Sequence, residues 1–172
     1  MLIAQRVVMI SSEFDRLFRG HERPGTIEPL IHKGEWAIHD VLPFLLQRTG
    51  PASVKIATFS VSEDSLRPLF FQVDSGMITK LTLLLDATVK RHKLDMLLFA
   101  MNITPDIRID SNHAKILLLQ NETNAFGIVG SANLNQPRRI EAGFYFTAGK
   151  YFDFFNEQFD KYYSEAMPYE LD

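Results

Sequence analysis

The stretch of sequence that decides the fold runs His113-Ala-Lys-Ile-Leu-Leu-Leu-Gln-Asn-Glu-Thr-Asn-Ala-Phe-Gly-Ile-Val-Gly-Ser-Ala-Asn133. It holds two apolar runs, at 116–119 and 126–129, on either side of a polar turn at 120–124. Each run is short and rich in Leu, Ile, Val and Phe, which is typical of a buried strand. The sequence therefore predicts two antiparallel strands joined in a hairpin.

Polar side chains flank this hairpin at one end. His113 and Lys115 precede the first strand, and Ser131 and Asn133 follow the second. Side chains two residues apart in an extended chain share a face, so the members of each pair are predicted to point the same way if the strands continue that far. The hairpin would bring both pairs together. A potential nucleophile, a cation and two small hydrogen-bonding groups in one place suit phosphate chemistry.

This pattern resembles the signature of the phospholipase D superfamily, which is His-x-Lys, an Asp five positions later, and then Gly-Ser-x-Asn. The matching residues are His113, Lys115, Gly130, Ser131 and Asn133. Glu141 stands near the position at which the family keeps a carboxylate that orients the histidine. The order of expected strands and helices is similar to that of the family over roughly residues 36–148.

The resemblance implies an α/β fold, in which a mixed β-sheet is flanked by helices on both faces in the phospholipase D-like arrangement. We expect a single domain over residues 1–172, in which residues 1–34 form an N-terminal extension that the sequence does not define further. Strands are expected at 53–60, 79–86, 106–109 and 139–147, and helices from about 35 or 40 to 46, and at 64–73, 92–101 and 150–166.

The positions of several prolines and apolar side chains in these helices can also be predicted. Pro43 and Pro68 are expected in the first turn of their helices, because proline has no amide hydrogen to donate. In the helix at 92–101, Leu94, Leu97 and Leu98 are predicted to share the buried side. In the last helix, Phe152, Phe155, Phe159 and Tyr162 fall at helical spacing, for which core packing is the first interpretation and a dimer contact the second.

Two positions depart from the signature of the superfamily. Gln120 stands where the family has Asp, and the turn before Gly130 is about three residues longer than usual. Glu122 is a candidate for the missing carboxylate, and the alternative is that this role is absent. In the family the Asp supports the site rather than performing the chemistry, so the residues expected to act on a phosphate are all present.

The expected chemistry follows from the types of residue. A neutral imidazole can attack phosphorus when its other ring nitrogen donates to a carboxylate that fixes the tautomer. As the resemblance implies, we expect His113 to be this nucleophile and Glu141 the orienting carboxylate. Lys115 and Asn133 are suited to stabilising the phosphoryl oxygens, and Ser131 can add a hydrogen bond. A phosphohistidine on His113 would then be hydrolysed by water.

A general acid is still needed to protonate the leaving oxygen. None of His21, His32, His39 and His92 is followed two residues later by Lys, and none precedes a Gly-Ser-x-Asn. Members of the superfamily with a single motif pair two copies across a two-fold axis. The resemblance therefore implies a homodimer in which each subunit contributes its His113 to a shared site.

The amino-acid composition of the chain excludes several kinds of functional site. The chain has 172 residues, a net charge of −3 and no cysteine, which excludes disulfides, thiolate metal sites and cysteine nucleophiles. A negative net charge gives no general attraction to nucleic acid, so binding would depend on local basic clusters. One such cluster is Lys90-Arg91-His92-Lys93, and the other is Arg138-Arg139. We expect Arg139 to contact substrate, because it lies between Asn133 and Glu141.

No membrane, cofactor or metal is expected. The apolar start of the chain is interrupted by Gln5 and Arg6, and no apolar run approaches the ~20 residues that span a bilayer, so we expect a cytoplasmic protein. Asp106, Asp110 and His113 could be imagined as metal ligands, but we interpret the two aspartates as part of a solvated loop.

The expected function is that of a metal-independent phosphodiesterase, a hydrolase that acts as a nuclease, with DNA preferred to RNA. This choice follows from the resemblance, because short single-motif members of the superfamily are commonly nucleases. Two alternatives remain open. One is a dimeric module that binds nucleic acid and has lost turnover, and the other is a hydrolase of phospholipids or small phosphodiesters.

Overall fold

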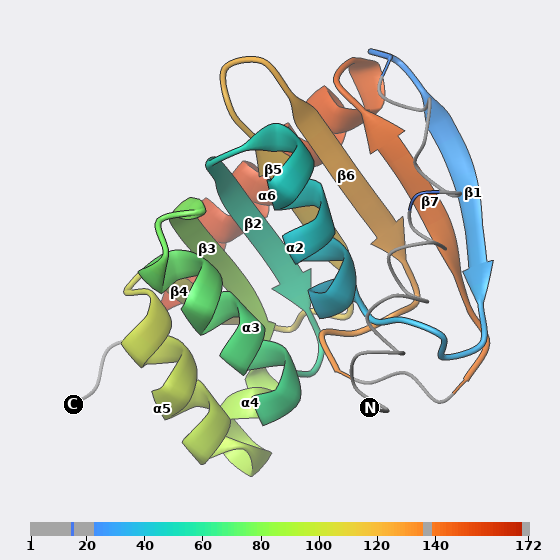
Figure 1. Cartoon of the computed structure of the whole chain (residues 1–172). Helices are drawn as coiled ribbons and strands as arrows, with labels where there is room; N and C mark the ends of the chain where they lie inside the picture. The colour runs from blue at the N-terminus through green and yellow to red at the C-terminus, as the bar shows by residue number, and fades with distance from the viewer. Residues whose placement is uncertain (1–14, 16–22, 136–138, 170–172) are drawn as a thin grey trace, which may run out of the picture.

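The protein is built around one eight-stranded β-sheet (Figure 1). The computed structural model describes residue 15, residues 23–135 and residues 139–169. The strands are β1 (Ile27–His32), β2 (Ala52–Thr58), β3 (Ile78–Asp86), β4 (Ile107–Asp110), β5 (Ile116–Gln120), β6 (Ala125–Gly130), β7 (Glu141–Thr147) and β8 (Met167–Pro168). The helices are α2 (Ile38–Thr49), α3 (Glu63–Asp74), α4 (Ala87–His92), α5 (Leu94–Ile103) and α6 (Lys150–Glu165).

The sheet is mixed, and its strand order is β1-β7-β6-β5-β2-β3-β4-β8. β2, β3 and β4 run parallel, while β1, β7, β6 and β5 pair with their neighbours antiparallel. Helices α2, α3 and α5 cover one face, and α6 lies on the opposite face (Figure 1). The predicted mixed sheet with helices on both faces is confirmed.

The predicted hairpin is formed by β5 and β6, with Ile116 opposite Val129 and Gln120 opposite Ala125. Its turn is closed by Asn121, whose side-chain oxygen accepts hydrogen bonds from the Thr123 and Asn124 amides at 3.1 and 2.9 Å. The Asn121 amide group also donates to the backbone oxygen of Thr49, the last residue of α2, at 2.8 Å. The extra length of the turn is therefore held by hydrogen bonds from one asparagine.

Two hydrophobic clusters lie on the two faces of the sheet. The larger one packs α2, α3 and α5 against residues such as Ile56, Leu83 and Leu117. The smaller one packs Phe152 and Phe159 of α6 against Ala57, Leu84 and Leu118. Neighbouring residues such as Leu117 and Leu118 enter different clusters because successive side chains of a strand point to opposite faces. Of the four aromatic residues predicted at helical spacing on α6, Phe152 and Phe159 are buried and Tyr162 is exposed.

The expectation that both prolines lie in a first helical turn was wrong. Pro43 is the sixth residue of α2 and Pro68 is the sixth of α3. A proline there leaves the carbonyl four residues earlier without its helical partner. Burial outweighs this loss, because each helix buries an apolar side that the proline does not interrupt, including Leu42 in α2 and Leu66 in α3. The cap of α3 is Ser62, one residue before the helix begins at Glu63, and the Ser62 amide donates to the Ser65 hydroxyl at 3.1 Å.

The helix expected over 92–101 is α5 (Leu94–Ile103), and a separate short helix that was not predicted, α4, precedes it. α4 begins after Asp86, whose carboxylate accepts a hydrogen bond from the Thr88 amide at 2.9 Å, and it ends at His92. α5 then begins at Leu94. Leu97 is buried as predicted, whereas Leu94 and Leu98 are exposed. The break at Lys93 turns α5 so that its buried side is formed by Leu97 together with residues of its last two turns.

The N-terminal part of the described chain forms the edge strand β1. It pairs antiparallel with β7, with Ile27 opposite Phe146 and His32 opposite Glu141. The segment that the sequence left undefined thus contributes a strand of the sheet from Ile27 onward. Across the residues that the structure describes, we find no helix of the length and apolarity that crossing a membrane requires.

Candidate active site

The residues of the signature gather at the end of the sheet where β5 begins and β6 ends. Lys115 lies directly before β5, and its carbonyl accepts a hydrogen bond from the Gly130 amide at 3.2 Å. Ser131 follows Gly130 and is hydrogen bonded to the backbone of Ala142 at the start of β7. Glu141 is the first residue of β7. Antiparallel pairing of β5, β6 and β7 therefore brings His113, Lys115, Ser131 and Glu141 to one end of the sheet.

Lys115 provides a buried cation, because its side chain is held away from water. The residue is only 7% exposed, and its Nζ donates to the His113 carbonyl at 2.6 Å. The same Nζ lies 3.0 Å from Nδ1 of His113 and 5.6 Å from the centre of the Phe59 ring. Burial lowers the pKa of the Lys115 ammonium, and the carboxylates of Glu141 and Asp86 oppose that shift. A poorly hydrated ammonium at this position can attract the oxygens of a phosphate strongly.

His113 has an exposed side chain, as a nucleophile requires. Its ring lies 4.9 Å from the ring of Phe59, at a tilt of 58°. The backbone around it is fixed by the buried side chain of Asn112. The Asn112 oxygen accepts from the Ala114 amide at 2.9 Å, and its amide group donates to the Leu84 carbonyl at 2.9 Å. The local sequence gave no sign of this role, because Asp-Ser-Asn before His113 is typical of any polar loop.

Asp86 holds the same loop from the end of β3. Its carboxylate accepts from the backbone amide of Asn112 at 2.9 Å and from the hydroxyl of Thr88 at 2.6 Å. Burial by itself raises the pKa of this carboxyl group, but the hydrogen bonds from Thr88 and Asn112 and the nearby His113 outweigh it, so that the pKa is lowered. Sequence reasoning missed Asp86 as a site residue. The available signal was an aspartate at the carboxyl end of a predicted strand with Thr two residues later.

Ser131 and Glu141 form a hydrogen-bonded pair. The Ser131 hydroxyl donates to Oε2 of Glu141 at 2.5 Å and accepts from the Ala142 amide at 3.0 Å. Within the described residues, no hydrogen bond joins Glu141 to His113. Nδ1 of His113 faces the Lys115 ammonium, so the expected carboxylate–histidine contact is not made in this structure.

Asn133 is partly buried, and its side-chain oxygen has no hydrogen-bond partner within the described residues. The next residue is firmly placed, because the Leu134 amide donates to the Thr58 hydroxyl at 3.1 Å. Buried polar atoms usually have a partner. The Asn133 side-chain oxygen is thus a buried acceptor that no described residue satisfies, beside a backbone fixed at Leu134.

The two basic clusters differ in their surroundings. Arg139 is exposed near the start of β7, while Arg138 lies outside the described residues. In the other cluster, Lys93 donates to the Ser60 hydroxyl at 2.8 Å and to the Val61 carbonyl at 2.6 Å. Lys93 thus stabilises the loop after β2, whereas Arg139 presents its charge to solvent near the site.

The departures from the signature lie away from this end of the sheet. Gln120 is the last residue of β5, about 16 Å from Lys115 by the rise of an extended strand. Glu122 is exposed in the turn between β5 and β6. Neither the missing aspartate nor the longer turn is therefore close to the chemistry, and Glu122 does not take the place of a site carboxylate.

His32 is not part of any sequence motif, yet it lies beside Glu141 across the β1–β7 pairing. The residue is 8% exposed, and its ring stacks on Trp36 with a ring separation of 3.8 Å. Burial lowers the pKa of His32, and the carboxylates of Glu35 and Glu141 oppose that shift. Only the long-range pairing of two strands places it there, and no local pattern could have indicated it.

The residues considered as metal ligands are not grouped. Asp106 lies 3.4 Å from the Lys80 ammonium, and Asp110 accepts a hydrogen bond from the Ser111 amide at 2.7 Å. In the part of the chain that the structure describes, no set of three or more His, Asp or Glu side chains is placed to hold a metal ion.

No protein-family model and no curated protein sequence matches the chain. Solved structures do match it. The phospholipase D family member Nuc from Salmonella typhimurium is 14% identical, with a TM-score of 0.65 over 86% of this chain and 99% of that one. NucT from Helicobacter pylori is 15% identical, with a TM-score of 0.60 over 84% and 100%. The archaeal chromatin protein TrmBL2 is 12% identical, with a TM-score of 0.54 over 98% of this chain and 64% of that one.

These likenesses establish the fold. Nearly the whole lengths of Nuc and NucT are matched, and both matches cover more than four fifths of this chain. The chain therefore has a phospholipase D-like fold, as the sequence predicts. Sequence identities of 12–15% carry no information about activity, so the function has to be argued from the site.

Proposed function

We propose that this chain, given its phospholipase D-like fold, is a metal-independent phosphodiesterase that cleaves nucleic acid with His113 as its nucleophile. One observation carries the proposal: the exposed imidazole of His113 lies beside the buried ammonium of Lys115, 3.0 Å away. An exposed ring can reach a phosphorus atom, and a cation shielded from water draws the phosphoryl oxygens to the same place.

In the first step, Nε2 of His113 attacks phosphorus while the bond to the leaving oxygen breaks. Nε2 has a lone pair only when the proton is on Nδ1. In the free protein Nδ1 faces the Lys115 ammonium. A bound phosphate gives that ammonium an anionic partner and frees Nδ1. The neutral imidazole then loses its Nε2 proton to water and gains one at Nδ1, and the ring turns so that Nδ1–H donates to a carboxylate. We assign this carboxylate to Glu141, which Ser131 already orients.

The leaving oxygen takes its proton from His113 of the partner subunit, which acts as general acid. In the second step that imidazole, now neutral, removes a proton from water, and the resulting hydroxide displaces Nε2 from phosphorus. Lys115, Asn133 and Arg139 hold the phosphate oxygens during both displacements. The proposed enzyme is therefore a homodimer with one histidine from each subunit at the scissile phosphate.

The test is cleavage of single- and double-stranded DNA and RNA in excess chelator, comparing the parent chain with His113→Ala. Ser111→Ala is the matched control, because Ser111 is an exposed residue of the same loop. We expect the parent and Ser111→Ala to cleave, DNA in preference to RNA, and His113→Ala to lose roughly 10³-fold or more in rate. Cleavage that requires an added divalent metal would contradict the mechanism.

A second candidate is a module that binds nucleic acid without turnover. The likeness to TrmBL2, whose structure is described as showing a novel mode of DNA binding, favours it. Phosphate-backbone binding that survives His113→Ala, with no cleavage by the parent, would support this reading. A hydrolase of lipids or small phosphodiesters would instead turn over a chromogenic diester and leave plasmid DNA intact.

A further inference from the structure

The ring of Phe59 lies beside both groups that the proposed reaction uses. Its centre is 4.9 Å from the centre of the His113 ring and 5.6 Å from Nζ of Lys115. Phe59 directly follows β2, whereas His113 and Lys115 precede β5, which pairs antiparallel with β2. The pairing of these two strands therefore places an apolar side chain between the nucleophile and the cation on one side and the loop after β2 on the other.

The backbone on either side of Phe59 is held firmly. Before it, the Thr58 hydroxyl donates to the Ser60 carbonyl at 3.0 Å. After it, the Lys93 ammonium donates to the Ser60 hydroxyl at 2.8 Å and to the Val61 carbonyl at 2.6 Å. Because the loop is fixed at both of its ends, the ring of Phe59 is held against its two neighbours by the surrounding structure.

The Lys115 ammonium has three N–H groups but few polar partners. Nζ donates to the His113 carbonyl at 2.6 Å and lies 3.0 Å from Nδ1 of the same residue. The carboxylates of Glu141 and Asp86 act on it without forming an ion pair within the described residues. A buried charge that water no longer solvates is costly unless other groups stabilise it. The charged form of Lys115 therefore depends on every group that faces Nζ.

The face of an aromatic ring is one such group. It carries partial negative charge and attracts a cation, most strongly where water is excluded. Nζ of Lys115 lies over the ring of Phe59. Among the lysines and arginines that the structure describes, Lys115 is the only one that is buried. The contact between Phe59 and Lys115 is thus the one in which a ring can replace lost water.

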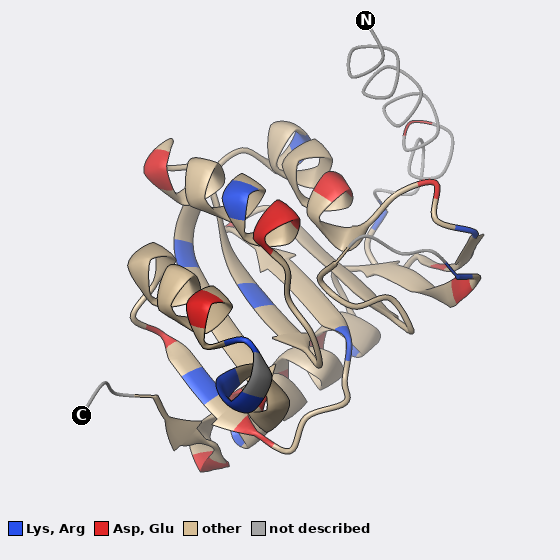
Figure 2. Cartoon of the chain, turned by 90° about the horizontal axis from the view of Figure 1, so that it is seen from below, with Lys and Arg blue, Asp and Glu red and all other residues tan. Residues whose placement is uncertain are grey.

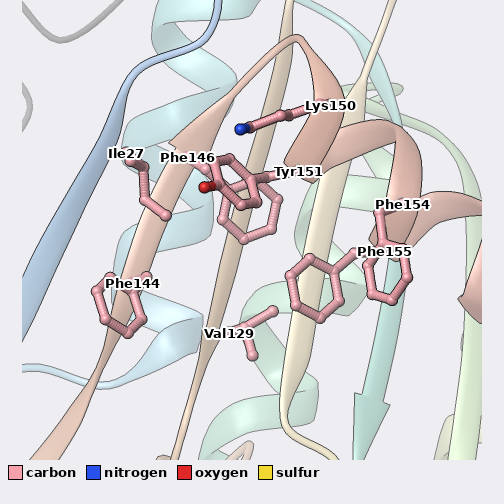
Figure 3. Close-up of a pocket in the computed structure, with 8 residues that line it drawn as sticks. All are labelled: Ile27, Val129, Phe144, Phe146, Lys150, Tyr151, Phe154 and Phe155. Atoms are coloured by element: carbon pink, nitrogen blue, oxygen red, sulfur yellow. The ribbon is translucent and has the colours of Figure 1, made fainter.

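Lys150 and Tyr151 form a similar pair in different surroundings. Nζ of Lys150 lies 4.8 Å from the centre of the Tyr151 ring. Both residues are exposed, and both line an open apolar cavity at the start of α6 (Figure 3). Water can solvate the Lys150 ammonium, so the ring beneath it contributes little to its charge. The two pairs therefore differ chiefly in burial.

We propose that Phe59 is a positioning residue: the face of its ring stabilises the buried Lys115 ammonium and holds it beside the His113 imidazole before substrate binds. The inference rests on the proposed function, in which Lys115 holds the scissile phosphate as a cation and His113 attacks it. Phe59 does not touch the reacting atoms in this role. It keeps the site in the charge state that a phosphate needs.

The role of Phe59 ends when a phosphodiester binds. The phosphate oxygens then become the partners of the Lys115 ammonium, and an anion attracts it far more strongly than a neutral ring does. His113 must also turn toward Glu141 at this stage. Phe59 meets the imidazole ring at a tilt of 58° and makes no hydrogen bond with it, so this rotation breaks no polar contact between the two rings.

The first test measures the pKa of Lys115 without substrate, by NMR titration of lysine isotopically labelled at Nζ. The signal of Lys115 is identified by its absence from Lys115→Arg. Phe59→Leu keeps an apolar side chain but removes the ring, so we expect the pKa of Lys115 to fall by about 0.5 or more. Phe59→Tyr keeps the ring and should restore the pKa of the parent. Equal pKa values in the parent and Phe59→Leu would overturn the proposal.

A second variant separates the charge of the ring from its shape. A trifluorinated phenylalanine in place of Phe59 fills nearly the same space, but its fluorine atoms withdraw negative charge from the ring face. We expect it to lower the pKa of Lys115, as Phe59→Leu does. If the pKa in this variant equals that of the parent, packing alone explains the effect of Phe59→Leu and the proposal is wrong.

Tyr151→Leu is the matched control, because it removes the ring beneath an exposed ammonium. The pKa of Lys150 should change little in this variant, and the pKa of Lys115 should not change. If Tyr151→Leu lowered the pKa of Lys150 as much as Phe59→Leu lowers that of Lys115, burial would give Phe59 no special importance, which would also overturn the proposal.

These titrations need no substrate, which separates the inference from the proposed function. A lower Lys115 pKa in Phe59→Leu, with no cleavage by the parent chain, supports the hold of Phe59 on the cation and refutes the enzyme. Cleavage by the parent, with an unchanged Lys115 pKa in Phe59→Leu, refutes the role of Phe59 and leaves the enzyme standing. If both proposals are right, the alkaline limb of kcat/KM in Phe59→Leu moves to lower pH by the same amount as the pKa of Lys115.

Discussion

Lys115 carries its positive charge in a position largely shielded from water, and this burial lowers its pKa. If the ammonium holds the scissile phosphate, kcat/KM should fall on the alkaline side at a pH below that of an ordinary lysine. In Lys115→Arg the alkaline limb should move to higher pH, whatever the loss in rate, because a guanidinium stays charged there. The measurement is a pH profile of kcat/KM on a short oligonucleotide. If the parent and Lys115→Arg had identical alkaline limbs, Lys115 would not be the cation that holds the scissile phosphate.

The burial of His32 leads to a prediction about how the free energy of unfolding depends on pH. Because burial lowers its pKa, the unfolded chain binds a proton more readily than the folded chain as the pH falls. The contribution of neutral His32 to the free energy of unfolding is therefore fully present above the pKa of the unfolded chain, about 6.5. It is lost as the pH falls toward the lower pKa of His32 in the folded protein. In His32→Phe, the free energy of unfolding should depend less on pH in this window. Urea unfolding at several pH values measures it, and equal slopes for both chains would contradict the prediction.

The motif residues could be predicted from the sequence, whereas the groups that support them could not. His113, Lys115 and Ser131 lie next to the two strands of one hairpin, so the apolar runs on either side of the turn fix their neighbourhood. Asp86 and Asn112 meet across two loops that follow different strands. Their contact depends on how β3, β4 and β5 are ordered in the sheet, which local spacing does not determine.

Strands β6 and β7 approach each other closely at Gly130 and Gly143, which are opposite one another. A side chain at Gly143 would collide with the backbone oxygen of Val129 and with Gly130. Gly143→Ala should therefore force the two strands apart and lower the free energy of unfolding by roughly 2 kcal/mol or more. Because Ser131 directly follows β6 and Glu141 begins β7, their hydrogen bond should also be disturbed. Chemical denaturation provides the measurement, and an unchanged midpoint would show that the sheet adapts.

The elements show where sequence patterns succeed and where tertiary packing overrides them. The helix at the C-terminal end has nearly the predicted bounds, because its aromatic residues repeat at helical spacing and its ends carry Gly149 and Ala166. The break between α4 and α5 was not foreseen, because no Gly or Pro marks it and the residues across it, Lys90 to Lys93, are all polar. At the break the Lys93 side chain is held by Ser60 and Val61 of the loop after β2, a long-range contact that only the folded structure reveals.

At the scale of the whole molecule, charge is dispersed. Lys and Arg are interspersed with Asp and Glu along the ribbon in the view of Figure 2, and the net charge is −3. The protein as a whole therefore gives a polyanion no general attraction. On this reading, binding of a phosphodiester depends on the few cations near the site, of which Lys115 is buried and Arg139 is exposed.

Formation of the proposed homodimer would also affect thermal stability. Because the surface between the two subunits is buried only when they associate, the midpoint of thermal unfolding should rise with protein concentration. Differential scanning fluorimetry over a hundredfold range of concentration measures it. A parent midpoint that does not change with concentration would indicate a folded, self-sufficient monomer.

The pairing of β1 with β7 determines when the chain can complete its fold during synthesis. The partner strand of β1 (Ile27–His32) is Glu141–Thr147, which is made more than a hundred residues later. β1 can therefore pair only after that long intervening segment has been synthesised. Until then, the edges of β1 and β6 that later meet β7 have no partner strand.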